Sequence, residues 1–140
     1  MNKVAIVFWS ATGNTETMAN CIAEGTGANG IIVPCTEMTP AKLAEFDVVA
    51  FGCPAMGAEQ LEESEFEPFM CELDDVIAGK QIALFGSYGW GNQEWMRDWE
   101  DRIVADGATV VNGEGIAVNG TPGPEAEDEL KALGQTLASL

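Results

Sequence analysis

Short apolar runs alternate with longer amphipathic segments along the whole chain. The runs at residues 4–9 and 48–51 are continuous in apolar side chains, which is typical of strands buried on both faces of a parallel sheet. The segments between such runs carry apolar residues three and four positions apart, as helices do. Trp95 and Trp99 have this spacing within residues 93–106, so we expect both indoles to pack in the core.

The pattern predicts five strands and five helices. Strands are expected at residues 4–9, 31–34, 47–53 and 81–86, with an interrupted fifth strand at 109–111 and 115–118. Helices are expected at residues 14–28, 40–45, 65–77, 93–106 and 125–140. Strands that alternate with helices through right-handed crossovers predict an α/β fold, an open, doubly wound, five-stranded parallel sheet. The chain has 140 residues and no linker, so we expect residues 1–140 to form a single domain.

The loop after the first strand has the chemistry of a phosphate site. Ligands of such sheets bind beyond the carboxyl ends of the strands, and the amino end of the following helix offers unpaired N–H groups and a positive dipole. The loop has no Lys or Arg and does not match the G-x-x-x-x-G-K-[ST] nucleotide loop. Neutral donors suit a monophosphate better than a Mg-bound triphosphate. The predicted phosphate-binding residues are Ser10, Ala11, Thr12, Gly13, Asn14 and Thr15.

Two further loops, at residues 54–63 and 87–92, follow the third and fourth strands. Gly57 permits a positive φ or a close backbone approach, and Met56 offers a soft apolar contact to an aromatic ring. Trp90 stands between two glycines and is free to stack on a planar ring. An ordinary turn with a packed methionine, and an indole buried in the core, are the structural alternatives. Together the three loops predict a phosphate pocket joined to a slot for a flat ring, which favours FMN over a pyridine or purine nucleotide.

The net charge of −17, from 23 acidic and 6 basic residues, narrows the range of partners. Such a surface repels nucleic acid and anionic lipid and favours basic proteins, unless the acidity serves solubility alone. No apolar run approaches the roughly 20 residues that span a bilayer. The first apolar run has six residues, fewer than the roughly 7–15 of a signal peptide's apolar region, so we expect a cytoplasmic protein.

Cysteine and histidine usage argues against a metal site. Cys21, Cys35, Cys53 and Cys71 are too widely spaced for a zinc finger or a C-x-x-C pair, and the chain has no histidine. We expect all four to be buried, reduced thiols. A four-cysteine iron–sulfur site is the alternative, although the clustered spacing of such sites is missing.

At the three loops the chain resembles the flavodoxins, in particular the short-chain form of anaerobic bacteria. Residues 10–15 match the family's phosphate loop Ser/Thr-x-Thr-Gly-x-Thr. Residues 55–59, Ala-Met-Gly-Ala-Glu, match the short-chain flavin loop, and residues 86–91, Gly-Ser-Tyr-Gly-Trp-Gly, match the stacking loop. The resemblance runs essentially end to end. It implies the flavodoxin-like strand order 2-1-3-4-5 and a non-covalently bound FMN.

The resemblance also implies roles for single residues. Met56 would lie against the inner face of the flavin and Trp90 against the outer face, with Tyr88 as the alternative stacking residue. The Gly57 carbonyl would accept a hydrogen bond from the reduced ring after a peptide flip, and Glu59 would bind the pyrimidine edge. Ala58 departs from the pattern, since relatives often carry a polar residue there. Further contacts are expected from Pro54, Ala55, Ser87, Gly89, Gly91 and Asn119.

The implied function is that of a low-potential one-electron carrier that shuttles between hydroquinone and neutral semiquinone, and not of an enzyme. The expected partners are basic-surfaced redox proteins, such as a reductase or ferredoxin-linked oxidoreductases, and the expected state is a monomer. Residues 55–79 hold eight acids and no base and would form the docking surface, unless they are only a solvated face. The functional alternatives are an NAD(P)H–quinone reductase and a flavin protein dedicated to activating a radical enzyme.

Overall fold

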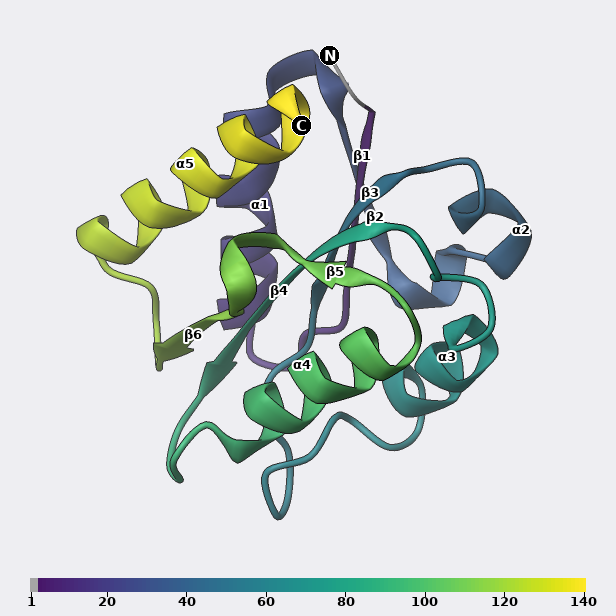
Figure 1. Ribbon diagram of the computed structural model, residues 1–140. Coiled ribbons are helices and arrows are strands. Elements are labelled where there is room, and N and C mark those ends of the chain that lie inside the picture. The colour runs from purple at the N-terminus through teal and green to yellow at the C-terminus, as the bar shows by residue number, and fades with distance from the viewer. Residues whose placement is uncertain (1–2) are drawn as a thin grey trace.

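The computed structural model describes residues 3–140 and contains one parallel sheet (Figure 1). Its strands are β1 (Val4–Phe8), β2 (Gly30–Pro34), β3 (Val48–Gly52), β4 (Gln81–Tyr88), β5 (Thr109–Val110) and β6 (Ile116–Asn119). The order is β2-β1-β3-β4-β5, and β6 also pairs with β4. This confirms the fold class and strand order implied by the sequence.

The predicted interruption of the fifth strand is also confirmed. β5 pairs with the start of β4, at Gln81 and Ile82, and β6 pairs with its last four residues. A 3-10 turn, η3 (Val111–Gly113), separates the two pieces, and Asn112 within it has a left-handed backbone at φ 64°. The two pieces therefore both pair with β4, and the second piece lies at the carboxyl end of that strand.

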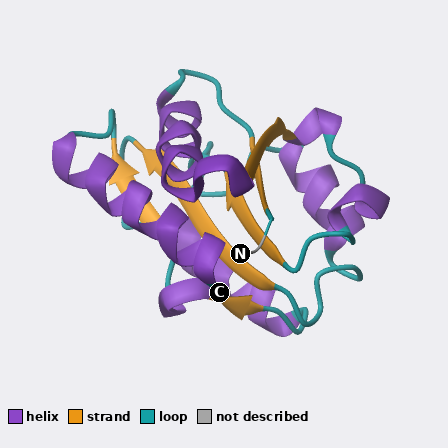
Figure 2. Ribbon diagram, turned by 90° about the horizontal axis from the view of Figure 1, so that it is seen from above, coloured by secondary structure: helices purple, strands orange, loops and turns teal. Residues whose placement is uncertain are grey.

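Helices cover both faces of the sheet, as Figure 2 shows from above. They are α1 (Asn14–Thr26), α2 (Pro40–Leu43), α3 (Phe66–Leu73), α4 (Glu94–Ala105) and α5 (Pro124–Ser139), with short 3-10 turns η1 (Gly27–Asn29) and η2 (Cys35–Glu37). The core has two parts: one cluster lies under α3 and α4, and the other lies under α1 and α5. Strands β1 and β3 are buried throughout, which confirms the interpretation of their continuous apolar runs.

Several element ends differ from the sequence-based prediction. β4 runs two residues further than expected because Ser87 and Tyr88 pair with β6, a long-range contact that local patterning does not contain. α3 ends at Leu73, four residues early, since the chain turns there and the N–H groups of Val76 and Ile77 both bond the Leu73 carbonyl. The predicted helix at residues 40–45 is a single turn, and α1 ends where Gly27 takes φ 64°.

The expectation that all four cysteines are buried is wrong for Cys71. Cys21, Cys35 and Cys53 are buried, whereas Cys71 is exposed, and all four are free thiols. The apolar side of α3 is formed by Phe66, Phe69, Met70 and Leu73, so the position of Cys71 falls on the opposite, solvent-facing side. Trp95 and Trp99 are buried as predicted, and the Trp95 indole N–H donates to the Cys53 carbonyl at 3.1 Å.

Candidate functional site

A cavity of about 230 Å³ lies at the carboxyl ends of β1, β3 and β4. It brings together eleven of the predicted contact residues, which come from all three loops. They are Ser10, Ala11, Thr12, Asn14, Thr15, Pro54, Ala55, Met56, Ser87, Tyr88 and Gly89. The three predicted loops therefore meet at one place, where the strand order reverses between β1 and β3.

The first loop leaves several donors free at the amino end of α1. Within the residues that the structure describes, the backbone N–H groups of Thr12, Asn14 and Thr15 have no acceptor. The Ser10 hydroxyl oxygen accepts the N–H groups of Gly13 at 3.1 Å and Glu16 at 3.3 Å, which holds the loop closed. Gly13 has φ 95°, a left-handed conformation in which glycine costs little. The loop thus places three unpaired N–H groups at the positive end of a 13-residue helix.

A buried hydroxyl pair joins this loop to the sheet. The Thr15 and Ser87 hydroxyl oxygens are 3.2 Å apart, and the Ser87 N–H points to the Thr15 hydroxyl at 3.4 Å. Thr15 is fully buried and Ser87 nearly so. Since Thr15 belongs to α1 and Ser87 to β4, the pair fixes the phosphate-loop side of the cavity against the fourth strand.

The second loop is a tight hairpin that carries Met56 at its base. Met56 and Gln60 exchange two backbone hydrogen bonds, of 2.8 and 3.0 Å. The tip contains two left-handed residues, Gly57 at φ 53° and Glu59 at φ 52°. The base is anchored because the Ala55 N–H bonds the Ser87 carbonyl at 3.0 Å. Met56 therefore has a fixed place on the cavity wall, while Gly57 and Ala58 lie at the free end of the hairpin.

Trp90, in the third loop, projects into solvent, with 67% of its surface exposed. The neighbouring Tyr88 is held in place instead: its ring packs against Trp95 with centroids 5.8 Å apart, and its hydroxyl accepts a bond from the Gln93 side chain at 3.1 Å. The structure thus rejects the alternative in which Trp90 packs in the core. An exposed indole beside a cavity is free to close over a flat ligand.

The Glu59 carboxylate links the second and third loops. One of its oxygens accepts the backbone N–H of Glu94 at 3.1 Å, at the first residue of α4. The carboxylate also lies against Gly91, where an added Cβ would come within 2.4 Å of its carbon. A carboxylate at a helix amino end is favourably placed. Glu59 itself borders a separate cavity of about 130 Å³, next to the predicted site.

Seven of the eighteen predicted residues do not line the cavity, and one cavity residue was missed. Gly13, Gly57, Ala58, Trp90 and Gly91 belong to the three loops without lining the cavity, and Asn119 borders a different pocket. Gly120, which the sequence analysis did not select, lines the cavity with φ 70°, and its N–H bonds the Tyr88 carbonyl at 2.9 Å. The Gly-Thr-Pro-Gly sequence after β6 was the available signal. The next residue, Thr121, bonds the Asn14 side chain at 3.2 Å and so ties this loop to the phosphate loop.

Comparison with known proteins identifies the family. The flavodoxin family model matches residues 6–134. The chain belongs to the flavodoxin family. It is 45% identical over 138 residues to a flavodoxin of Clostridium beijerinckii, covering 96% of this chain and 99% of the relative. It is 44% identical to a flavodoxin of Megasphaera elsdenii, with 96% and 98% covered. The solution structure of two-electron reduced Megasphaera elsdenii flavodoxin matches with a TM-score of 0.86, covering 98% and 99% of the two chains.

This flavodoxin is an FMN-binding electron carrier, and its cavity fits the cofactor. Three unpaired N–H groups and the neighbouring hydroxyls can donate the hydrogen bonds that a phosphate ester accepts. The Met56 side chain on the cavity wall and the exposed Trp90 indole can provide the apolar contacts that a flat ring needs. Within residues 3–140, no helix is long and apolar enough to cross a membrane.

Proposed function

We propose that the cavity holds FMN, with the phosphate on the amino end of α1 and the ring between Met56 and Trp90. The proposed contact residues are the eighteen predicted from the sequence, together with Gly120. The single observation that carries this assignment is the set of unpaired N–H groups of Thr12, Asn14 and Thr15, beside hydroxyls and without a base. Bound FMN supplies the electron-transfer chemistry, and the chain sets its affinity and potentials.

The acidic surroundings favour a low potential. Among residues 3–140, no Lys or Arg lines the cavity, and the second loop continues into Glu59, Glu62, Glu63 and Glu65. One negative charge about 10 Å from another costs roughly 0.4–1.7 kcal/mol for effective dielectric constants between about 80 and 20. Several carboxylates therefore oppose the addition of further negative charge to the site. We infer a carrier that passes single electrons at low potential.

Removal of the Trp90 indole tests the proposed ring site. We expect Trp90→Ala to weaken FMN binding about 10- to 100-fold, because stacking and the exclusion of water over one ring face are lost. The measurement is a titration of the apo-protein with FMN, followed by absorbance and by quenching of flavin fluorescence. Val104→Ala is the control, since Val104 is also an exposed apolar residue (60% exposed) but lies on α4 outside the cavity. Equal affinities of the two variants would contradict the ring placement.

Gly57 tests whether the hairpin tip tunes the potentials. We propose that the Gly57 peptide reorients to direct its carbonyl oxygen, a hydrogen-bond acceptor, into the ring site. Gly57 has φ 53°, and an added Cβ meets nothing closer than the Gln60 amide at 4.0 Å, so a side chain acts through backbone conformation and not through packing. We expect Gly57→Val to narrow the gap between the two one-electron reduction potentials. Potentiometric titration measures the gap, and an unchanged gap would rule out the reorientation.

We also propose that the protein acts as a cytoplasmic, monomeric, single-domain carrier with no substrate turnover of its own. Its partners would be basic-surfaced redox proteins, such as a reductase or ferredoxin-linked oxidoreductases. Direct oxidation of NADPH by the FMN-loaded protein in the presence of a quinone would contradict this and favour the reductase alternative. Electron transfer with a basic partner that slows as salt is added would support it.

A further inference from the structure

A second hollow, of about 280 Å³, adjoins the FMN cavity on the β2 side of the phosphate loop. It lies at the carboxyl ends of β2 and β1 and shares Ser10 with the FMN cavity. Its lining combines an apolar part, from Phe8, Trp9 and Pro34, with the carboxylates of Glu16 and Glu65. We call it the Trp9 hollow. Apart from Ser10, none of the residues that we propose to contact FMN lines it.

One hydrogen bond organises the Trp9 hollow. The Trp9 indole N–H donates to a Glu65 carboxylate oxygen at 2.8 Å, across 56 residues of sequence. This bond holds a half-buried indole and an exposed carboxylate side by side. Glu65 also immediately precedes α3, so its backbone is fixed by the start of that helix.

The two carboxylates of the hollow share it with no basic residue of the described part of the chain. Among residues 3–140, no Lys or Arg lines it. Arg97, Arg102 and Lys131 form ion pairs with other acids, and the buried Lys80 donates to the carbonyls of Ala44 and Phe46. Two carboxylates beside an aromatic ring attract a cation by charge and through the face of the ring.

We propose that the Trp9 hollow receives an arginine or lysine side chain of the protein partner with which this flavodoxin exchanges electrons. This inference rests on the proposed electron-carrier function and adds an anchoring point for the partner. The volume admits one long side chain, whose apolar stem would lie against Phe8 and Pro34 while its head meets Glu16 and Glu65. Because the hollow borders the phosphate loop, a partner anchored there is held next to the FMN cavity.

Binding of a single arginine is the direct test. The probe is N-acetylarginine amide, and the readout is the NMR signal of the Trp9 indole N–H, assigned with Trp9→Phe. We expect a saturable shift at millimolar probe and no shift with the neutral isostere N-acetylcitrulline amide. In Glu65→Gln, where the amide oxygen still accepts the indole N–H but the charge is gone, we expect the shift to weaken at least threefold. Equal shifts with both probes, or none, would overturn the proposal.

Electron transfer tests the same hollow in the loaded protein. One electron passes from the dithionite-reduced, FMN-loaded protein to the ferric haem of mitochondrial cytochrome c, a basic protein, and the rate is followed by stopped flow at low salt. We expect the Glu16→Gln/Glu65→Gln double variant to be about five- to tenfold slower than the wild type, with a weaker salt dependence. We expect Trp9→Leu, which leaves the net charge unchanged, to slow transfer about threefold. Potentials are measured alongside, so that a change in driving force is separated from a change in docking.

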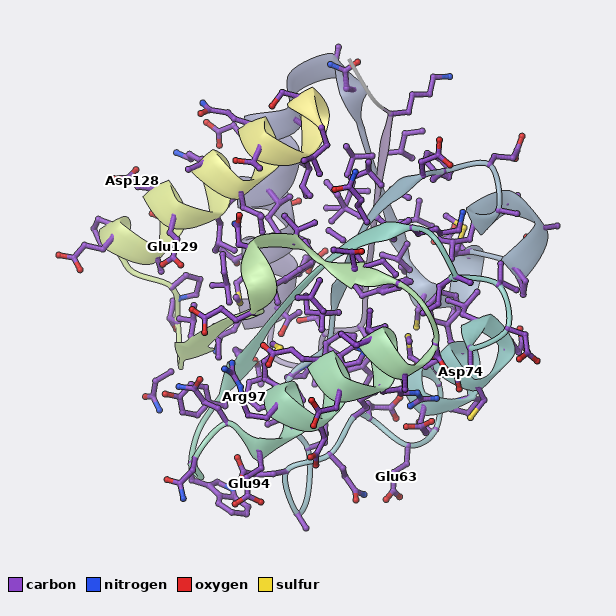
Figure 3. All side chains as sticks on the ribbon, viewed as in Figure 1. Glu63, Asp74, Glu94, Arg97, Asp128 and Glu129 are labelled. Carbon is purple, nitrogen blue, oxygen red and sulfur yellow. The ribbon has the colours of Figure 1, made fainter. Side chains whose placement is uncertain are left out.

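The matched control removes two charges that lie outside the Trp9 hollow and outside the FMN cavity. Asp128 and Glu129 lie on α5 (Figure 3), and neither lines the Trp9 hollow or the FMN cavity. We expect Asp128→Asn/Glu129→Gln to change the rate less than twofold. Equal slowing by both double variants would mean that only net charge matters and would overturn the proposal. The FMN absorbance of the wild type tests the proposed function separately. A failure of the docking proposal can therefore be told apart from a failure of FMN binding.

Discussion

Gly134→Ala is expected to lower the free energy of unfolding by about 2 kcal/mol or more, although alanine favours helices. Gly134 lies in α5 where that helix crosses α1. A Cβ at this position would stand 2.1 Å from the Ile22 carbonyl oxygen and 3.0 Å from the Cα of Gly25, both backbone atoms of α1. Backbone cannot rotate away, so the helices must separate. Overpacking of this kind costs typically about 1–3 kcal/mol and occasionally more, which outweighs the gain of about 1 kcal/mol in helix propensity.

Urea unfolding at a fixed excess of FMN measures this effect. Gly123→Ala is the matched control, because a Cβ at Gly123 meets nothing within 4 Å and its φ of −91° suits any residue. We expect the control to change the unfolding free energy by less than about 0.5 kcal/mol, as exposed substitutions usually do. A Gly134→Ala protein as stable as the control would show that α1 and α5 can separate at little cost.

Glu62→Gln is expected to cost about 2–3 kcal/mol at pH 7, because Glu62 forms the cap of α3. Its buried carboxylate accepts the backbone N–H groups of Ser64, Glu65 and Phe66 at 2.8, 2.7 and 2.9 Å, and also the Ser64 hydroxyl. Burial alone would raise the pKa of Glu62, but these hydrogen bonds to the ionised form outweigh it, so the pKa lies below its ordinary value of 4.5.

The sign of the pH dependence follows from that lowered pKa. A carboxyl that is more acidic in the folded state stabilises the protein fully above its unfolded pKa, and loses this stabilisation as the pH falls through the folded pKa. The gap between wild type and Glu62→Gln should therefore be largest at neutral pH and shrink below about pH 4. Glu72→Gln, on the exposed side of α3, is the control and should show no such gap. A gap that stays constant down to pH 3 would contradict the capping role.

The Glu62 cap bears on function because it fixes the segment that leaves the FMN cavity. The hairpin at residues 56–60 precedes it, and Glu65, which binds the Trp9 indole, follows it. The Glu62 N–H also points to the Cys53 sulfur at 3.4 Å, at the end of β3. Burial raises the pKa of the Cys53 thiol far above its ordinary value, so that sulfur stays protonated at neutral pH.

Local patterning was sufficient for the elements and insufficient for their ends. The continuous apolar runs identified β1 and β3, and helical spacing placed Trp95 and Trp99 in the core, because both depend on the faces of a single element. The last two residues of β4 and the exposure of Cys71 were mispredicted. β4 is extended by pairing with β6, some 30 residues away in sequence, and Cys71 was judged by its residue type instead of by its side of α3.

The sequence by itself was enough to predict the parallel α/β sheet and the three ligand-binding loops, because the spacing of apolar residues and the chemistry of a loop are local properties. Its resemblance to a family was enough to predict a flavin-binding electron carrier. The tertiary structure decided which donors stay unpaired, that Gly120 joins the cavity, and that Trp9 meets Glu65. These contacts join residues far apart in the chain, so each depends on strand order and helix placement. No stretch of sequence records them, since they arise only when the whole sheet has formed.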